Sequence, residues 1–427
     1  MDGFLVVFAF VALFVLGFPV VLAIGIPCFV YVFAKDFPID LVAQRTLYAL
    51  DSFPLVAVPV FLFVGSLMNS AGISRYIYTF ADTVAGRLPG GLAQVNIFGS
   101  LIFAGMSGSA LADIGGIGRI EIDAMRSKGF SPAFAAAVTS SSAIVGPIFP
   151  PSIPLIIYGT VTGVSVIQLL LGGILPGLLC VAMLMLMTGW LAVRRRYPRA
   201  PRWPTGKDLW RDFKPAAPAI AAPVILIGGM LLGYFTPTEI ASVTVAYAIL
   251  ISTLFYRELT WKGLLDAAYE TIRASAGILL IVAVAALFGW ILSVEQVPQT
   301  LTGWMLRIST DPYVLLLIVN VLLLVVGMFL DSTTAILVIA PIIAKPLVAA
   351  GVDPVHLGMV VVFNLMIGLL TPPMGLALFL VGDIAKVSMK DVLRAMAPYY
   401  IPLGATLLLI TYVPAITTWI PTMALGN

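Results

Sequence analysis

Long apolar runs recur along the chain and alternate with short polar stretches. A run of about 20 apolar residues is long enough to cross a bilayer as a helix. Lipid accommodates only helices or closed barrels, and these runs are too long for barrel strands. The pattern therefore predicts an all-α, polytopic membrane protein. Its first run is expected to form one helix that is kept and not cleaved as a signal peptide. The apolar runs cover residues 4–33, 54–71, 133–161, 169–193, 218–235, 240–256, 274–294, 312–330, 355–381 and 397–420.

Four stretches of mixed polarity lie between these runs, at residues 36–52, 74–87, 259–272 and 296–309. The third carries Leu264, Leu265, Ala268 and Ile272 on one helical stripe, as expected for a helix that lies along the membrane surface. We expect all four to be interfacial helices that brace a fixed frame.

Composition narrows the class further. Hydrophobic residues make up 61% of the 427 residues and charged residues only 10%, far below the charge of a soluble domain. The net charge of +3 gives no sign of nucleic-acid binding. Two cysteines inside apolar runs and a single histidine predict neither a disulfide nor a metal cluster. The chain has no G-x-x-x-x-G-K-[ST] loop, so we expect no cofactor and an ion gradient or a separate ATPase as energy source.

The basic residues predict the orientation in the membrane. If the loops around 194–203, 126–128, 257–262 and 386–394 share one side, that side holds all but four of the 23 Lys and Arg residues. The positive-inside tendency makes it the cytoplasm and leaves Lys35, Arg45, Arg307 and Lys345 outside. We expect the N-terminus inside and the C-terminus outside.

The two halves of the chain share one plan. GPIFPP (146–151) and GLLTPP (368–373) align at an offset of 222, which also aligns GMSGS (105–109) with GMFLD (327–331). Basic residues precede the first Pro-Pro segment and follow the second, so the repeats are expected to be inverted in the membrane. Inverted repeats with broken helices are typical of transporters that place substrate and ions at the midplane. A duplication that serves packing alone is the alternative.

The repeats suggest a division into a scaffold and a transport domain. Residues 1–90 would form scaffold helices and the interfacial arm of the first repeat. Residues 91–193 would carry its transport elements, a re-entrant hairpin at 91–128 and a broken helix at 131–163. Residues 194–311 would add a cytoplasmic loop, scaffold helices and interfacial arms. Residues 312–427 would carry a hairpin at 312–351, a broken helix at 355–386 and a final helix.

Each hairpin tip is rich in glycine, serine or carboxylate. At membrane depth, a backbone amide or carbonyl outside a helix costs several kcal/mol unless a hydrogen-bond partner or an ion satisfies it. Sodium does so with carbonyl, hydroxyl and carboxylate oxygens. Interhelical packing is the commoner role of a single Ser or Thr, but carboxylates inside membranes are rare and usually functional. Asp113 and Asp331 therefore carry the prediction.

The Pro-Pro stretches must break their helices, because each proline lacks an amide donor and clashes with the preceding turn. The breaks free carbonyls near Gly146, Phe149, Pro150, Gly368, Leu370 and Thr371. The half-helices that follow present partly positive N-termini, which suit an anionic substrate. We expect one sodium site at Ser107, Ser109, Asp113, Gly146, Phe149 and Pro150. We expect a second sodium site at Gly327, Asp331, Thr333, Thr334, Gly368, Thr371 and Pro372. The substrate would lie between them, against Ser109, Ser152, Ser332, Thr334 and Pro373.

At these motifs the chain resembles the large membrane subunit of the tripartite ATP-independent periplasmic (TRAP) transporters, in the ion transporter superfamily. The likeness rests on GMSGSALADIGGIG, GPIFPPSIP, GMFLDSTTA and GLLTPPMG in that order and extends over essentially the whole chain. It implies sodium-driven uptake of an organic acid anion across the bacterial inner membrane by an elevator motion. It also implies a soluble periplasmic binding protein and a small four-helix membrane subunit, here a separate polypeptide. The chain resembles sialic-acid members most, and C4-dicarboxylates are the other substrate class considered.

The sequence leaves three other functions open to comparison. A stand-alone sodium/carboxylate transporter would need neither partner. An intramembrane serine protease would use Ser107 as nucleophile and His356 as base, but the two are expected at different depths. A passive channel is disfavoured, because paired inverted hairpins indicate alternating access. His356 and Lys345 are expected at the interface, with Lys345 snorkelling.

Overall fold

The computed structural model of the protein describes residues 2–426, apart from the side chain of Leu306. All regular secondary structure in the described part is helical, and seven of its helical segments are long and apolar enough to cross a membrane. The predicted all-α polytopic class is confirmed. The first half contains α1 (Gly3–Val15), α2 (Val20–Ala34), α3 (Asp40–Leu50), α4 (Phe53–Ser70), α5 (Ser74–Ala85), α6 (Leu92–Ser107), α7 (Ala110–Gly115), α8 (Ile117–Ser127), α9 (Pro132–Ala143), α10 (Ile153–Thr162), α11 (Val166–Gly172) and α12 (Ile174–Arg195). The second half contains α13 (Gly206–Leu231), α14 (Pro237–Leu250), α15 (Trp261–Val294), α16 (Val297–Ile308), α17 (Pro312–Gly327), α18 (Ser332–Ala349), α19 (Pro354–Gly368), α20 (Leu376–Ala385), α21 (Met389–Met396), α22 (Tyr400–Tyr412) and α23 (Ala415–Leu425).

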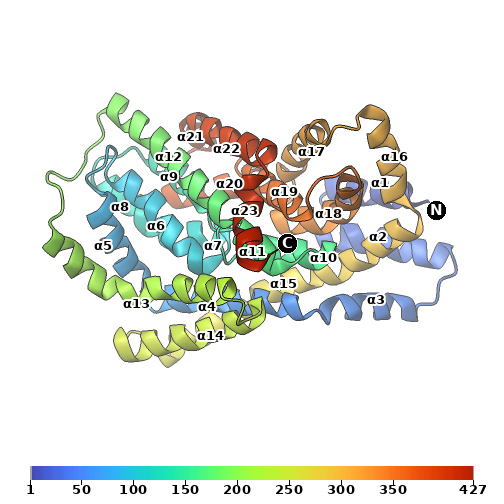
Figure 1. Ribbon diagram of the computed structural model, residues 1–427, viewed down its shortest axis with the longest axis horizontal. Helices are drawn as coiled ribbons and strands as arrows, with labels where there is room; N and C mark the ends of the chain where they lie inside the picture. The colour runs from blue at the N-terminus through green and yellow to red at the C-terminus, as the bar shows by residue number, and fades with distance from the viewer. Residues whose placement is uncertain (1, 427) are drawn as a thin grey trace.

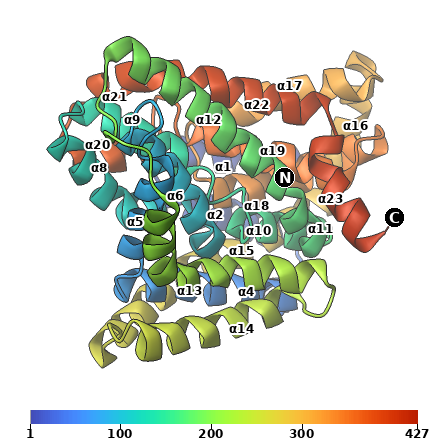
Figure 2. The same cartoon turned by 60° about the vertical axis from the view of Figure 1, so that its left-hand side comes forward.

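One group of long helices forms a layer along one side of the molecule (Figures 1 and 2). In this layer α4 packs against α14 and α15, α3 packs against α15, and α13 packs against α14. The two sets of hairpins and broken helices lie against this layer and cross over: α20 packs with α7 and α9 at one end, and α10 packs with α18 towards the other (Figure 1). Helices α12 and α22 pack together across the opposite side.

The first hairpin turns at a single left-handed glycine. Helix α6 ends at Ser107, Gly108 has φ +64°, and Ser109 caps the next helix. The glycine- and serine-rich stretch 105–109 predicts a wider tip, but Gly105 and Ser107 are still helical. The return arm is two helices, since the backbone leaves the helical region at Gly116 (φ −88°, ψ −97°) between α7 and α8.

The second hairpin turns over a slightly longer stretch. Helix α17 ends at Gly327, and α18 begins after Asp331, whose carboxylate accepts a hydrogen bond from the Thr334 amide. The far ends of the two helices come back together, because a Cβ on Gly351 would lie 4.0 Å from Pro312 Cγ. Residues 312–351 thus form one antiparallel pair.

Both Pro-Pro segments interrupt a helix. The first lies between α9 and α10, the second between α19 and α20, and the Pro-Pro bond is cis in each. Gly163, after the end of α10, lines the same cavity as Asp353, before the start of α19. At the other end α20 and α21 pack against α9. The two broken helices therefore run in opposite directions.

The predicted single helix over residues 4–33 is wrong. Gly17 (φ +87°) and Pro19 separate α1 from α2, and the two are antiparallel. The Glu295 carboxylate joins both free ends: it accepts from the Gly3 amide at 3.4 Å and the Tyr31 hydroxyl at 2.6 Å. Lys35 lies 3.2 Å from the same carboxylate. The N-terminus and Lys35 are thus on one face, and their expected separation across the membrane is wrong.

Two further boundaries differ from expectation. Residues 259–272 are not a separate interfacial helix, because α15 runs without a break from Trp261 to Val294. The final run divides into α22 and α23 at Val413 and Pro414. The other three expected arms are helices, namely α3, α5 and α16.

Candidate ion and substrate site

The first hairpin tip gathers oxygen atoms around one buried carboxylate. The Ser107 hydroxyl donates to Asp113 Oδ1, and Ser109 Oγ accepts from the Ala112 amide at 3.5 Å as the cap of α7. The Asp113 side chain is 2% exposed. Its other oxygen, Oδ2, has no hydrogen-bond partner among the described residues. A buried carboxylate oxygen without a partner is costly, and a cation would satisfy it.

The unpartnered oxygen faces the first helix break. A Cβ on Gly146 would lie 2.5 Å from Asp113 Oδ2, so only glycine allows this approach. The tip and the break also meet through their backbones, where the Ile153 amide donates to the Gly108 carbonyl at 3.5 Å. The structure thus brings Ser107, Asp113 and Gly146 together, as predicted for the first sodium site.

The first break supplies further oxygen atoms. Within residues 2–426 the carbonyls of Gly146, Phe149 and Pro150 accept no protein hydrogen bond. The Ser152 hydroxyl donates to the Pro147 carbonyl and accepts from the Leu155 amide at 3.2 Å. Ser152, predicted to contact substrate, is therefore a buried cap of α10. The free carbonyls belong to the break whose Gly146 approaches the Asp113 carboxylate, and oxygens of both kinds are ligands for a hard cation.

The second hairpin tip is organised differently. Asp331 accepts from both the amide and the hydroxyl of Thr334, so its oxygens cap α18. Its side chain is half-buried, whereas Thr334 is fully buried. Ser332 and Thr333 lie in the first turn of α18 and are half-buried.

The second tip meets its break at two glycines. A Cβ on Gly368 would lie 2.5 Å from Gly327 Cα, so the backbones of α17 and α19 touch. In this break the Gly368 carbonyl already accepts from the Thr371 amide, and the Leu370 carbonyl accepts from the Tyr400 hydroxyl at 2.5 Å. The Thr371 hydroxyl donates to the Ile367 carbonyl. In this conformation the Asp331 oxygens, the Gly368 carbonyl and the Thr371 hydroxyl of the predicted second sodium site thus bond within their own segments.

The breaks differ in exposure as well. Pro150 and Pro151 are buried, whereas Pro372 and Pro373 are exposed. Among the predicted substrate residues, Ser109 and Ser332 are half-buried at the two tips, Ser152 and Thr334 are buried, and Pro373 is at the surface.

A buried polar contact ties each hairpin to its broken helix. In the first repeat the Ser142 hydroxyl donates to Asn96 Oδ1 at 2.7 Å. In the second, Asn364 Nδ2 donates to Asn320 Oδ1 at 2.8 Å. Ser142 and Asn364 are the pair that the repeat offset aligns. The sequence alone gave no reason to single out Asn96 and Asn320.

A second acidic residue of the first hairpin escaped the sequence reasoning. Glu121 on α8 is fully buried, and neither carboxylate oxygen has a hydrogen-bond partner in the described chain. A Cβ on Gly99 of α6 would lie 3.1 Å from its Oε1. The signal was present in its spacing, because Glu121 occupies the buried stripe formed by Ile117, Gly118, Ile122 and Met125.

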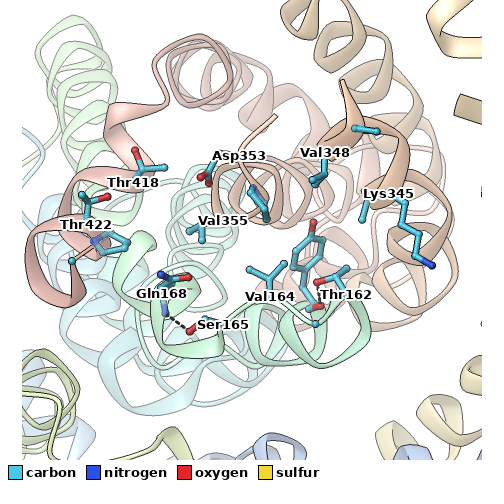
Figure 3. A pocket seen from close by; sticks show the side chains of 17 residues that line it. Thr162, Val164, Ser165, Gln168, Lys345, Val348, Asp353, Val355, Thr418 and Thr422 are labelled. Carbon is cyan, nitrogen blue, oxygen red and sulfur yellow. Dashed lines mark hydrogen bonds between the residues drawn. The ribbon is translucent and has the colours of Figure 1, made fainter. Parts of the chain in front are cut away.

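A cavity of about 790 Å³ opens where the broken helices meet the C-terminal helix (Figure 3). Its polar lining includes Gln168, Asp353, Thr418 and Thr422. The hydroxyl of Tyr158, which also lines it, is buried and unpartnered within the described residues. Sequence reasoning did not find this cavity, because it forms from segments far apart in the chain.

His356, expected at the membrane interface, is buried inside the protein near the start of α19. The side chain is 2% exposed, and its ring nitrogens contact Thr417 Oγ1 at 3.0 Å and the Thr411 carbonyl oxygen at 3.2 Å. It joins α19 to α22 and α23, while Ser107 bonds Asp113 at the first tip. The structure does not pair Ser107 with His356, so the protease arrangement is absent from the described residues.

Two hairpins, two oppositely directed broken helices and seven apolar spans define a polytopic membrane transporter. Residues 5–416 match the family model for the tripartite ATP-independent periplasmic transporter, DctM component. The chain belongs to this family and is the large permease subunit of a TRAP transporter, not an enzyme.

Individual relatives agree with this assignment. The chain is 42% identical over 388 residues to the sialic acid TRAP transporter large permease protein SiaM of Vibrio cholerae, covering 91% of each chain. It is 31% identical to the C4-dicarboxylate TRAP transporter large permease protein DctM of Rhodobacter capsulatus, covering 99% of each. Among solved structures, the YdaH transporter of Alcanivorax borkumensis has the same fold, with a TM-score of 0.63 at 18% identity over 91% of this chain and 89% of that one.

Proposed function

We propose that this subunit imports an organic acid anion across the bacterial inner membrane, using sodium as the coupling ion. The observation that carries the proposal is the buried, unpartnered oxygen of Asp113 beside Gly146 and three free carbonyls of the first break. Ser107, Ser109, Phe149 and Pro150 complete this first sodium site. The second site, at Gly327, Asp331, Thr333, Thr334, Gly368, Thr371 and Pro372, forms in another conformation, because here Asp331, Thr334 and the Gly368 carbonyl bond within their own segments.

The hairpins and broken helices would move as one body against the layer of α3, α4, α13, α14 and α15, in an elevator motion. Opposite directions of the two broken helices support it, since paired inverted elements allow two mirror-related states. The substrate is a carboxylate, sialic acid or a C4-dicarboxylate, as the names of the relatives suggest. Ser109, Ser152, Ser332, Thr334 and Pro373 remain its proposed contacts.

The proposed partners are a separate small four-helix membrane subunit and a periplasmic binding protein. By the positive-inside tendency, the face of Lys35, Arg45, Arg307 and Lys345 is periplasmic. The C-terminus belongs to this face, because Gly426 and Lys345 line one cavity. The N-terminus belongs to it as well, since Gly3 and Lys35 share Glu295.

Reconstitution tests the proposal. The subunit, the candidate small subunit and the binding protein are combined in proteoliposomes, and uptake of radiolabelled sialic acid and succinate is measured under an inward sodium gradient. We expect uptake of one of them that requires sodium and the binding protein. Equal uptake under a potassium gradient would refute sodium coupling, and full uptake without the binding protein would identify a stand-alone transporter.

A further inference from the structure

A second cavity, of about 630 Å³, separates the helix layer from the hairpin elements. Its walls come from α3 and α15 on the side of the layer and from α10 and α18 on the other. We call it the α3–α18 cavity. It shares Thr162, Ala344 and Lys345 with the cavity of Figure 3, so the two adjoin at the end of α18.

The α3–α18 cavity extends inwards from the face of Lys345. Its lining runs along α15 from Ser293 to Val282, about 16 Å at the helical rise of 1.5 Å per residue. Along α18 it runs from Lys345 to Leu337, five residues from the first residue of that helix. The cavity therefore leads from the proposed periplasmic face towards the second hairpin tip.

Basic groups line its outer part. Arg45 and Lys345 both border the cavity, and Arg45 is held over the Trp290 ring with its guanidinium carbon 5.5 Å from the ring centroid. Neither has a carboxylate within 4.0 Å among residues 2–426, whereas Lys35 is paired with Glu295. Figure 3 shows the Lys345 side chain turned away from Gln168 and Val355, the other side of the adjoining cavity. Asp51 also lines the α3–α18 cavity, so the formal charges of Arg45, Lys345 and Asp51 give the cavity a net charge of +1.

Three hydroxyl groups of the wall act as acceptors. Thr160 donates to the Ile156 carbonyl at 2.8 Å, Thr162 to Tyr158 at 2.7 Å and Ser293 to Gly289 at 3.0 Å. Because each hydroxyl proton is used within its own helix, the oxygen has only lone pairs to offer a ligand. Such a wall suits a ligand that carries hydroxyl groups of its own.

We propose that the α3–α18 cavity is an entry site for a hydroxylated monocarboxylate, whose carboxylate binds Arg45 and Lys345. One net positive charge matches one carboxylate, and the hydroxyl oxygens of Thr160, Thr162 and Ser293 accept hydrogen bonds from the ligand. A second carboxylate on the ligand would lie near Asp51 or in the apolar depth beside Leu337. The proposal rests on the proposed uptake of an organic anion and specifies its entry route and class.

The first test measures the electrostatic field without transport. Ser293 is exposed in the cavity, and Cys28 and Cys180 are both fully buried, so Ser293→Cys provides one accessible thiol. Impermeant thiosulfonates, one anionic and one cationic, are added from outside to spheroplasts. Thr310→Cys, an exposed position that does not line the cavity, is the control. We expect the anion to react faster than the cation at Ser293→Cys by roughly tenfold relative to the control.

The same ratio of anionic to cationic labelling rates tests whether Arg45 and Lys345 create the field. Adding Arg45→Gln and Lys345→Gln to Ser293→Cys should bring the ratio down to that of the control. A ratio already equal to the control, or unchanged by both substitutions, would overturn the proposal. Labelling of Ser293→Cys only from the cytoplasmic side would overturn it as well.

The second test uses uptake of radiolabelled sialic acid by the complete reconstituted complex. Arg45→Gln and Lys345→Gln should each raise the KM roughly tenfold with kcat nearly unchanged, because a charge-assisted contact made on entry is lost. Arg307→Gln, which removes a basic residue of the same face outside the cavity, should leave the KM unchanged. Gluconate should compete with sialic acid better than succinate does.

The failures of the two proposals are distinguishable. If wild-type complex shows no sodium-dependent uptake, the proposed function fails, while the labelling ratio still tests the cavity. If wild-type uptake is normal and both substitutions leave KM and labelling unchanged, the entry site alone is refuted.

Discussion

Single residues at the first hairpin tip carry most of the chemistry. Asp113 is buried, shares Oδ1 with the Ser107 hydroxyl and points Oδ2 at the backbone of Gly146. The carboxylate of the second tip, Asp331, which the repeat offset aligns with Ser109, instead caps α18. In this conformation the first proposed site has a free carboxylate oxygen and is preorganised for a cation, whereas the carboxylate of the second is already bonded.

Replacement of Asp113 tests this difference. Asp113→Asn keeps the size of the side chain but removes its charge, so the sodium concentration for half-maximal uptake should rise roughly tenfold or more. Asp123→Asn is the matched control, because Asp123 lies on the same hairpin and is exposed. An unchanged sodium dependence of Asp113→Asn would remove this residue from the ion site.

At the scale of elements, the second repeat is held together by backbone contact between α17 and α19. Gly327 and Gly368 approach so closely that neither accommodates a Cβ without movement. The contact places the second hairpin tip against its break, although no buried carboxylate lies there. Close packing of small residues is a common way to join membrane helices.

Gly368→Ala should therefore destabilise the fold. The added methyl group would overlap the Gly327 backbone and cost about 1 to 3 kcal/mol, as overpacking usually does. Gly277→Ala is the control, since a Cβ there meets nothing within 4 Å and alanine favours α15 by up to about 1 kcal/mol. Thermal unfolding in detergent should show a lower midpoint for the first variant and an equal or higher one for the second. Equal midpoints for Gly368→Ala and wild type would show that the backbones are not in contact.

The pair α1 and α2 depends on one carboxylate, Glu295, which follows the end of α15. The Tyr31 hydroxyl that donates to it, and then Lys35, hold the pKa of Glu295 below its ordinary value of about 4.3. A lowered pKa in the folded state means that the stabilisation is complete above the ordinary value. It is lost as the pH falls through the lowered value.

Glu295→Gln should loosen both free ends of the pair, at a cost of about 1 to 2 kcal/mol. Hydrogen exchange of peptides from α1 and α2 should be faster in this variant at pH 7. In wild type, protection of these peptides should be lost only at acidic pH, where Glu295 becomes protonated. Asp266→Asn, an exposed carboxylate of the same helix, should change neither. Wild-type exchange in Glu295→Gln would show that Glu295 does not anchor the pair.

At the scale of the whole molecule, local signals in the sequence predicted the interruptions and tertiary contacts decided the rest. Pro-Pro pairs and the Gly108 turn act within a few residues, so both breaks and both hairpins were predictable. Gly17 and Pro19 carried a similar signal, but the apolar length of residues 4–33 obscured it. Charges in 259–272 suggested a separate helix, whereas α15 continues through them. The Asn320–Asn364 contact and the α3–α18 cavity arise between distant segments and could not be predicted, whereas the helical spacing of Glu121 with the buried face of α8 carried a local signal.

Opposite placement of the two hairpins is the claim on which both alternating access and the entry cavity depend. Ser127 at the base of the first hairpin and Thr310 beside the base of the second are exposed, and both native cysteines are buried. Ser127→Cys and Thr310→Cys are treated with an impermeant thiol reagent in spheroplasts and in inside-out vesicles. Ser127→Cys should react only in the vesicles and Thr310→Cys only in the spheroplasts. Reaction of both variants from the same side would contradict the inverted arrangement.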